Sequence, residues 1–138
     1  MAYQHVLVVC DGSSAGDEAV RAASELARRD RARLTVAAIV ELERPGHGCQ
    51  FGGSTWNDVL RDAASADLDR ARTVVDSPAH FTVLCGPPRR ALVDGVRELG
   101  CDAIMLPQRP RGRLTRLLSR DRAEALRRST DCTVLQPR

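Results

Sequence analysis

The sequence contains no lysine, so all 21 of its basic residues are arginines. A uniform choice of Arg over Lys is typical of a bias in genomic base composition rather than of selection at one site. The absence excludes two kinds of chemistry, because a Schiff base needs a lysine amine and a P-loop needs a lysine that reaches the phosphates. The formal net charge of +3 is modest. Mechanisms that depend on lysine are therefore ruled out.

Aromatic residues are also scarce, at 3% of the chain. They are Tyr3, Phe51, Trp56 and Phe81. The 43% of apolar residues can still form a core, which must be built from Ala, Val, Leu and Ile. No apolar run approaches the roughly 20 residues of a membrane span, and the N-terminal segment enters a strand-like run without the basic region of a signal peptide. We therefore expect one domain over residues 1–138, located in the cytoplasm and without membrane association.

The five cysteines are widely spaced and form no Cys-x-x-Cys motif. An odd number in this arrangement is a poor framework for disulfides. Cys10, Cys85 and Cys132 lie within apolar runs, so we expect them to be small core residues. His47-Gly48-Cys49 resembles half of a metal site, but no other histidine stands at a zinc-like spacing from it. We therefore expect neither a disulfide scaffold nor a metal site.

Short apolar runs that end in turn residues alternate along the chain with segments of helical periodicity. We predict strands at 5–10, 34–40, 81–85, 102–106 and 132–136, and helices at about 14–30, 55–75, 88–99 and 119–129. A loop rich in Gly and Pro separates the second strand from the second helix, at 41–54, and an Arg-rich connection follows the fourth strand, at 107–118. Ser13 or Ser14 is suited to cap the first helix.

Alternating strands and helices predict right-handed crossover units and a parallel sheet with helices on both faces. Ligands of such sheets bind at the carboxyl ends of the strands, where the strand order reverses. We expect that point at the ends of the first and fourth strands, at Asp11 and residues 107–112.

Four segments of the chain resemble one known family. They are Val8 to Ser13 with its Asp-Gly-Ser ending, Ala22 to Arg28, Gly86-Pro87-Pro88, and the stretch from Asp102 through Arg111-Gly112-Arg113-Leu114 to Leu135. No segment is specific alone, but their order, spacing and the total length together resemble the universal stress protein family along nearly the whole chain.

The resemblance implies a doubly wound, five-stranded parallel sheet of order 3-2-1-4-5, Rossmann-like and similar to adenine nucleotide alpha hydrolase folds. It also implies a homodimer, formed in many members through the last strand, here 132–136. Some members bind ATP and others do not. The ATP binders carry a signature after the fourth strand: Gly, two residues, Gly, nine residues, Gly, then Ser or Thr. Its glycines let the backbone approach the phosphates, and its end opens a helix that favours an anion.

This chain departs from the signature at each anchor position. Pro107 and Pro110 stand at the first two glycine positions, and Arg120-Asp121 at the final pair. Proline removes a backbone donor and fixes φ, and the Asp121 carboxylate would repel a phosphate at the helix N-terminus. Only Gly112, within the variable stretch, remains. The loop is thus poorly suited to bind ATP by the family's mechanism.

Arginines around this loop offer a different means of holding a nucleotide or another anion. Arg109, Arg111 and Arg120 are the candidates, together with Arg113, Arg116 and Arg122, because guanidinium groups bind phosphate bidentately. Two interpretations stay open. In the first, the loop is a solvated segment without a ligand and the protein needs no cofactor. In the second, ATP with Mg²⁺ is bound through arginines.

Four further residues belong to the candidate cleft. By resemblance, Asp11, with Gly12 and Ser13 beside it, would face the ribose or adenine of a nucleotide, and Ile39 would lie beside the adenine. Both Asp11 and Ile39 also have structural interpretations: Asp11 as a cap of the first helix region, and Ile39 as a core residue.

Enzymatic activity is not expected. The three histidines of the chain suggest no Ser-His or Cys-His pair. Residues 109–128 contain eight arginines against two acidic residues, which would attract polyanions, but aromatic platforms and groove-reading motifs for nucleic acid are absent. Our leading hypothesis is a dimeric, non-catalytic regulatory or interaction domain in stress response with an unidentified protein partner. An Arg-dependent nucleotide binder and a polyanion binder are the alternatives.

Overall fold

The computed structural model describes residues 2–40, 53–108, 126–130 and 132–137. Its helices and strands alternate in the predicted order. They are β1 (His5–Val9), α1 (Ser14–Asp30), β2 (Arg33–Val40), α2 (Gly53–Val74), β3 (His80–Cys85), α3 (Pro88–Leu99), β4 (Ala103–Met105) and β5 (Thr133–Leu135). Residues 126–129 are also helical.

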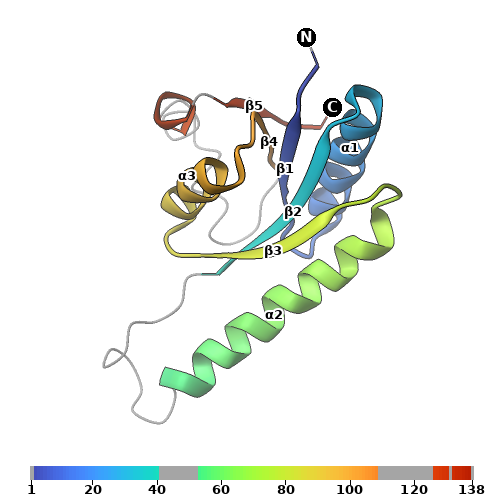
Figure 1. The fold of residues 1–138 in the computed structure, drawn as a ribbon. Helices are drawn as coiled ribbons and strands as arrows, with labels where there is room; N and C mark the ends of the chain where they lie inside the picture. Colours follow the sequence, from blue (N-terminus) through green and yellow to red (C-terminus); the bar gives the residue numbers. More distant parts are fainter. Residues whose placement is uncertain (1, 41–52, 109–125, 131, 138) are drawn as a thin grey trace.

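The strands form one parallel sheet in the order β3-β2-β1-β4-β5, which confirms the predicted topology (Figure 1). In the register, Leu7 of β1 lies between Thr35 of β2 and Ile104 of β4. All five residues of β1 are buried, as expected for a central parallel strand that is covered on both faces.

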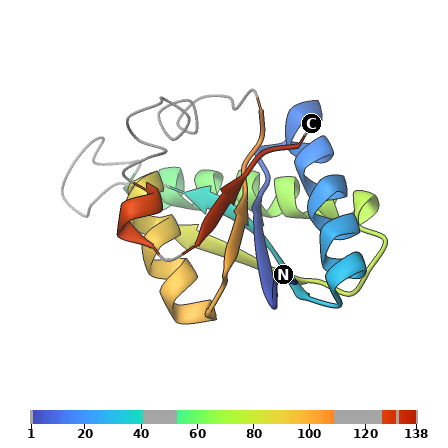
Figure 2. The same ribbon diagram turned by 90° about the horizontal axis from the view of Figure 1, so that it is seen from above.

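Helices cover the two faces of the sheet (Figure 2). The side chains of Val6 and Val8 pack with α1 and α2 on one face, whereas Leu7 and Val9 pack with α3 and Leu126 on the other. Successive residues of a strand point to opposite faces, so one strand supplies both cores. Most of the fully buried side chains are aliphatic, as predicted, with Ser24 and Thr35 as polar exceptions, while Tyr3 and Phe81 are only half-buried.

The described cysteines are Cys10, Cys85, Cys101 and Cys132, and the structure shows no disulfide among them. Three are buried, but Cys85 is exposed, so its predicted place in the core is wrong. Cys85 is the last residue of β3, a strand at the edge of the sheet that pairs only with β2. The end of an edge strand is not covered by helices, so an apolar residue there can be exposed. The apolar run alone does not show that its strand lies at the edge.

Within the described residues, no helix combines the length and the apolar character needed to span a membrane.

Candidate functional site

The strand order reverses between β1 and β4, where the sheet opens at its carboxyl edge. The chain leaves β1 through Cys10, whose N–H donates to the carbonyl of Ala37 at 2.9 Å, and leaves β4 through Leu106, whose N–H donates to the carbonyl of Leu135 at 2.9 Å. These hydrogen bonds to the sheet thus fix the positions of Cys10 and Leu106, the residues that follow β1 and β4. Asp11 and Pro107 follow them directly, as the sequence predicts.

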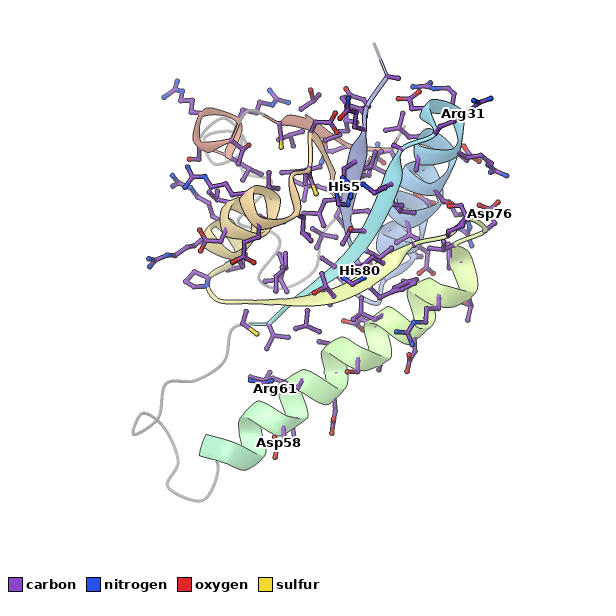
Figure 3. The ribbon with its side chains drawn as sticks, in the orientation of Figure 1. His5, Arg31, Asp58, Arg61, Asp76 and His80 are labelled. Carbon is purple, nitrogen blue, oxygen red and sulfur yellow. The ribbon has the colours of Figure 1, made fainter. Side chains whose placement is uncertain are left out.

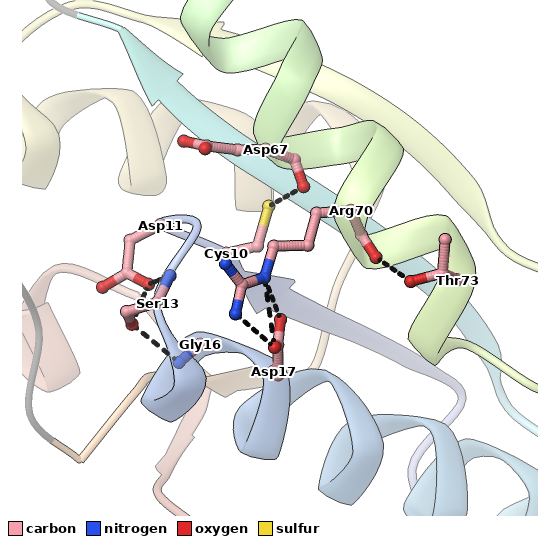
Figure 4. A network of polar contacts seen from close by, with 8 residues as sticks. All are labelled: Cys10, Asp11, Ser13, Gly16, Asp17, Asp67, Arg70 and Thr73. Carbon is pink, nitrogen blue, oxygen red and sulfur yellow. Dashed lines mark hydrogen bonds and ion pairs between the residues drawn. The ribbon is translucent and has the colours of Figure 1, made fainter.

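A tight turn follows β1 and leads into α1 (Figure 4). Gly12 has a φ of +77°, in the left-handed region that favours glycine. The Asp11 carboxylate accepts hydrogen bonds from the N–H of Ser13, at 3.0 Å, and from the Ser13 hydroxyl. The turn therefore folds the Asp11 side chain back onto its own backbone.

Ser13 is the N-cap of α1. Its hydroxyl oxygen accepts from the N–H of Gly16 at 3.0 Å, and its carbonyl accepts from the N–H of Asp17 at 3.0 Å. Because the hydroxyl hydrogen points to Asp11, the carboxylate orients the cap. A Cβ on Gly16 would overlap this carboxylate. Asp11 therefore has a structural role, carried out through Ser13 rather than by capping the helix itself.

Asp67 of α2 lies against the same turn, so that a Cβ on Gly12 would overlap its carboxylate. Burial raises the pKa of Asp67, and the neighbouring negative charge of Asp11 raises it further, while Arg70 lowers it. The guanidinium of Arg70 is already engaged by Asp17, with its Nη2 at 2.8 Å and its Nε at 3.1 Å from Oδ2 (Figure 4). The turn thus brings two carboxylates, Asp11 and Asp67, close together.

Cys10 lies beneath these carboxylates, and its Sγ donates to the Asp67 carbonyl at 3.8 Å. Burial, followed by the charges of Asp67 and Asp11, raises the pKa of Cys10 to about 12. The thiol is therefore protonated at neutral pH, and a protonated thiol is a poor nucleophile.

Asp11, Gly12 and Ser13 form the turn after β1, and Ile39 lies near the carboxyl end of β2. Ile39 is half-buried and packs against the core on the α3 side, opposite Leu84 of β3 in the register. Its contacts are those of a core residue near the edge of the sheet.

Asp67 was not among the residues predicted for the site. A signal was present, because Ala64, Leu68 and Ala71 mark the buried stripe of α2 and Asp67 adjoins it. A carboxylate beside such a stripe faces either a partner or a site. The sequence alone did not indicate that this partner would be the turn after β1.

Pro107 is fully buried directly after β4. It has no N–H to offer at the first anchor position of the glycine signature. The other predicted residues of this loop lie outside the described residues: Arg109, Pro110, Arg111, Gly112, Arg113, Arg116, Arg120, Asp121 and Arg122.

Chemically, the described part of the site is acidic. Carboxylates accept hydrogen bonds from hydroxyl and amino groups and repel phosphates. They are also the hard oxygen donors that Mg²⁺ prefers. In the described part of the chain, no group of three or more His, Cys, Asp or Glu side chains is arranged to hold a metal ion.

A groove of about 860 Å³ lies at the opposite, amino edge of the sheet. Figure 3 shows His5, Arg31, Asp76 and His80 around it. The His5 ring is buried between the Leu99 carbonyl, 3.0 Å from Nδ1, and the Thr35 hydroxyl, 2.7 Å from Nε2. Burial lowers the pKa of His5. The lining carries charges of both signs, so it does not select one class of ligand.

Comparisons with known proteins agree with this architecture. Residues 2–136 match the model of the universal stress protein family. A universal stress protein from Burkholderia pseudomallei is 26% identical, with a TM-score of 0.72 over 99% of this chain and 97% of that one. A universal stress protein in complex with cAMP is 22% identical, with a TM-score of 0.61 over 99% and 97%. One from Archaeoglobus fulgidus in complex with dAMP is 18% identical, with a TM-score of 0.62 over all of both chains. No curated protein sequence matches the chain.

Proposed function

The chain belongs to the universal stress protein family, and from this premise we propose that it is a non-catalytic regulatory or interaction domain whose strand-end site binds ATP weakly or not at all. The domain would act in the cytoplasm, where its free cysteines stay reduced.

One observation carries this proposal: the Asp67 carboxylate lies over Gly12, next to Asp11. The turn after β1 thereby presents negative charge on the side from which a triphosphate would approach. Like charges at short range in a partly buried site repel strongly. The burial of Pro107 adds to the argument, because that position cannot donate an N–H to a phosphate.

A nucleoside monophosphate is the second candidate ligand. Two structurally similar family members are complexes with cAMP and with dAMP, and a single phosphate needs fewer donors than a triphosphate. Asp11 could accept from ribose hydroxyls, and Arg109, Arg111 and Arg120 could supply the phosphate contacts. If Mg²⁺ accompanies a nucleotide, Asp11 and Asp67 are the described oxygen donors suited to it.

Thermal unfolding in the presence of ligands tests the proposal. A ligand at a hundredfold excess over its Kd stabilises the folded state by about 2.7 kcal/mol. We expect ATP to leave the melting temperature unchanged, with or without Mg²⁺. If a nucleotide raises the melting temperature, we expect it to be cAMP or dAMP. An ATP-dependent shift that disappears in Asp11→Ala would contradict the non-binding proposal.

A gain-of-binding variant tests whether the charge of Asp67 is the cause of the weak ATP binding. If the Asp67 charge excludes ATP, Asp67→Asn should bind ATP measurably more tightly than the wild type. Asp62→Asn is the matched control, because Asp62 is an exposed carboxylate on the same helix. Equal ATP affinity in all three proteins would show that Asp67 does not control binding.

We further propose a homodimer formed through the outer edge of β5. Val134 is buried and Thr133 is exposed at this end of the sheet, whose edge backbone groups are available for pairing. Sedimentation should give a dimer for the wild type and a monomer for Thr133→Arg, which adds charge at the edge. A wild-type monomer at all concentrations would contradict the proposal.

A further inference from the structure

The outer face of α3 has a concentration of positive charge that the strand-end site does not use. Arg89, Val93 and Arg97 are spaced four residues apart and Arg90 lies next to them, so their side chains share one face of the helix. The opposite face, with Leu92 and Val96, is buried in the core. All three arginines are exposed, and Figure 3 shows nitrogen-ended side chains projecting from the α3 region away from the sheet.

This face is hollowed rather than flat. A pocket of about 430 Å³ is lined by Pro87, Arg89, Arg90, Val93, Arg97 and Ser129. Among the described residues, its lining therefore combines three guanidinium groups, one hydroxyl and two apolar side chains, without a carboxylate.

Two of the arginines are held in place by the neighbouring segment. Nη2 of Arg89 donates to the Ser129 hydroxyl at 3.3 Å, and Nη2 of Arg97 donates to the Ser129 carbonyl at 3.3 Å. Each guanidinium has five N–H donors, so most of them stay available after this contact. Ser129 is the last residue of a helical segment anchored by the fully buried Leu126. The pocket is thus built from two elements rather than from one freely moving surface.

No ion pair neutralises the positive charge of the pocket in the part of the chain that the structure describes. Among residues 2–40, 53–108, 126–130 and 132–137, the ion pairs join Arg28, Arg29, Arg70 and Arg72 to aspartates, and none involves Arg89, Arg90 or Arg97. Three neighbouring like charges repel one another within the screening length of about 10 Å at 0.1 M salt. An anion bound between them would remove this repulsion.

We propose that this α3 pocket binds the phosphate group of a small phosphorylated organic molecule. Arg89, Arg90 and Arg97 would bind the phosphate dianion, since guanidinium groups form charge-assisted, bidentate bonds with phosphate. Val93 and Pro87 would contact the carbon skeleton of the ligand. The site is distinct from the acidic turn after β1 and does not depend on whether that turn binds a nucleotide.

A nucleic acid fits these observations less well. Binding of single strands relies on a groove that follows the backbone and on aromatic side chains that stack with bases. Among the residues that the structure describes, the lining of the α3 pocket has no aromatic side chain. A compact hollow with three guanidiniums suits one phosphate group.

Titration with glucose 6-phosphate, followed by ¹H–¹⁵N NMR, tests the proposal. We expect saturable shifts confined to residues 89–97 and 129, with inorganic phosphate binding more weakly at the same residues. Glucose should cause no shift, nor should sodium chloride at matched ionic strength. Shifts that depend on ionic strength alone, or that centre on residues 11–16, would overturn the proposal. Saturable shifts at the α3 pocket with RNA but not with glucose 6-phosphate would also overturn it.

Variants of exposed arginines identify the groups involved. Arg97→Gln should weaken glucose 6-phosphate binding at least about tenfold, which corresponds to about 1.4 kcal/mol. Arg97→Lys should lie between Arg97→Gln and the wild type, because lysine keeps the charge but not the fork of donors. Arg61→Gln, on the exposed side of α2, should bind like the wild type. Equal affinity in all four proteins would overturn the proposal.

Discussion

The turn after β1 and the outer face of α3 both collect charge, but they hold it in different ways. In the turn, Asp11 accepts from Ser13, and Asp17 is paired with Arg70. On α3, Arg89 and Arg97 bond only to uncharged groups of Ser129 among the described residues. In the turn, the charged groups form hydrogen bonds and an ion pair within the fold, whereas the guanidinium groups on α3 are exposed to solvent.

The comparison indicates how charge relates to role in this protein. A charged group that is half-buried and hydrogen-bonded within the fold contributes to stability, and its removal leaves donors without acceptors. An exposed guanidinium without a carboxylate contributes little to folding and is available to a ligand. Substitutions in the turn should therefore change stability, and substitutions on α3 should change binding alone.

The largest expected effect is that of Gly12→Ala. The residue has a φ of +77°, where an L side chain costs about 1–2 kcal/mol, and the new Cβ would also overlap the Asp67 carboxylate. We expect a loss of about 2 kcal/mol in the free energy of unfolding, measured by urea denaturation.

Gly100→Ala is the matched control for this substitution. Gly100 has a similar φ of +70°, but nothing lies within 4 Å of a Cβ there. It should cost only about 1 kcal/mol, the strain of the backbone. Equal losses of unfolding free energy in the two variants would show that the Asp67 carboxylate does not contact the turn at Gly12. The proposed acidic site depends on this contact.

A smaller loss is expected for Ser13→Ala. The substitution removes the N-cap of α1 and takes a hydroxyl donor from Asp11. N-cap replacements by alanine cost about 1 kcal/mol. Ser14→Ala, at the next and exposed position, is the control and should be nearly neutral. If Ser14→Ala were the more destabilising of the two in urea denaturation, the assignment of the cap would be wrong.

Much of this turn was predictable from sequence. A buried apolar run followed by Asp-Gly-Ser-Ser requires a strand, a tight turn and a helix start, and these fix the neighbourhood of Asp11 to Ser13 without tertiary information. The parallel sheet followed from the alternation of strands and helices, whereas its strand order was implied by the family resemblance. Local chemistry was sufficient for the turn, and a general rule of topology was sufficient for the parallel sheet.

The remaining features depend on contacts between distant segments. Asp67 meets Gly12 across 55 positions of sequence, and Ser129 meets Arg89 across 40; no local pattern encodes either contact. The exposure of Cys85 depends on β3 being the edge strand, which an apolar run cannot show. In the same way, the sequence does not show that Ser129 lies beside the arginines of α3.

A stabilising effect is expected for Asp67→Asn. Burial and the charge of Asp11 raise the pKa of Asp67 above its usual value of 3.8. A group whose pKa is raised on folding favours the folded state at low pH, and this contribution is lost as pH rises through its folded pKa. The wild type should therefore melt at a lower temperature than Asp67→Asn at pH 7, and the two melting temperatures should converge below about pH 3.8. A gap independent of pH would mean that the charge of Asp67 is not the cause.

The smallest effect on stability is expected on α3, and it is the sharpest test of the contrast between the two regions. Arg90→Gln removes an exposed charge for which no ion pair exists in the described part of the chain. The free energy of unfolding should change by no more than about 0.5 kcal/mol. The change should become smaller as added salt screens the interactions of Arg90 with Arg89, Asp94 and Arg97. Arg70→Gln, which breaks the bidentate pair with Asp17, should be destabilising under the same conditions. If urea denaturation showed Arg90→Gln to be the more destabilising of the two, the arginines of α3 would be part of the fold, and their charge would no longer point to a ligand.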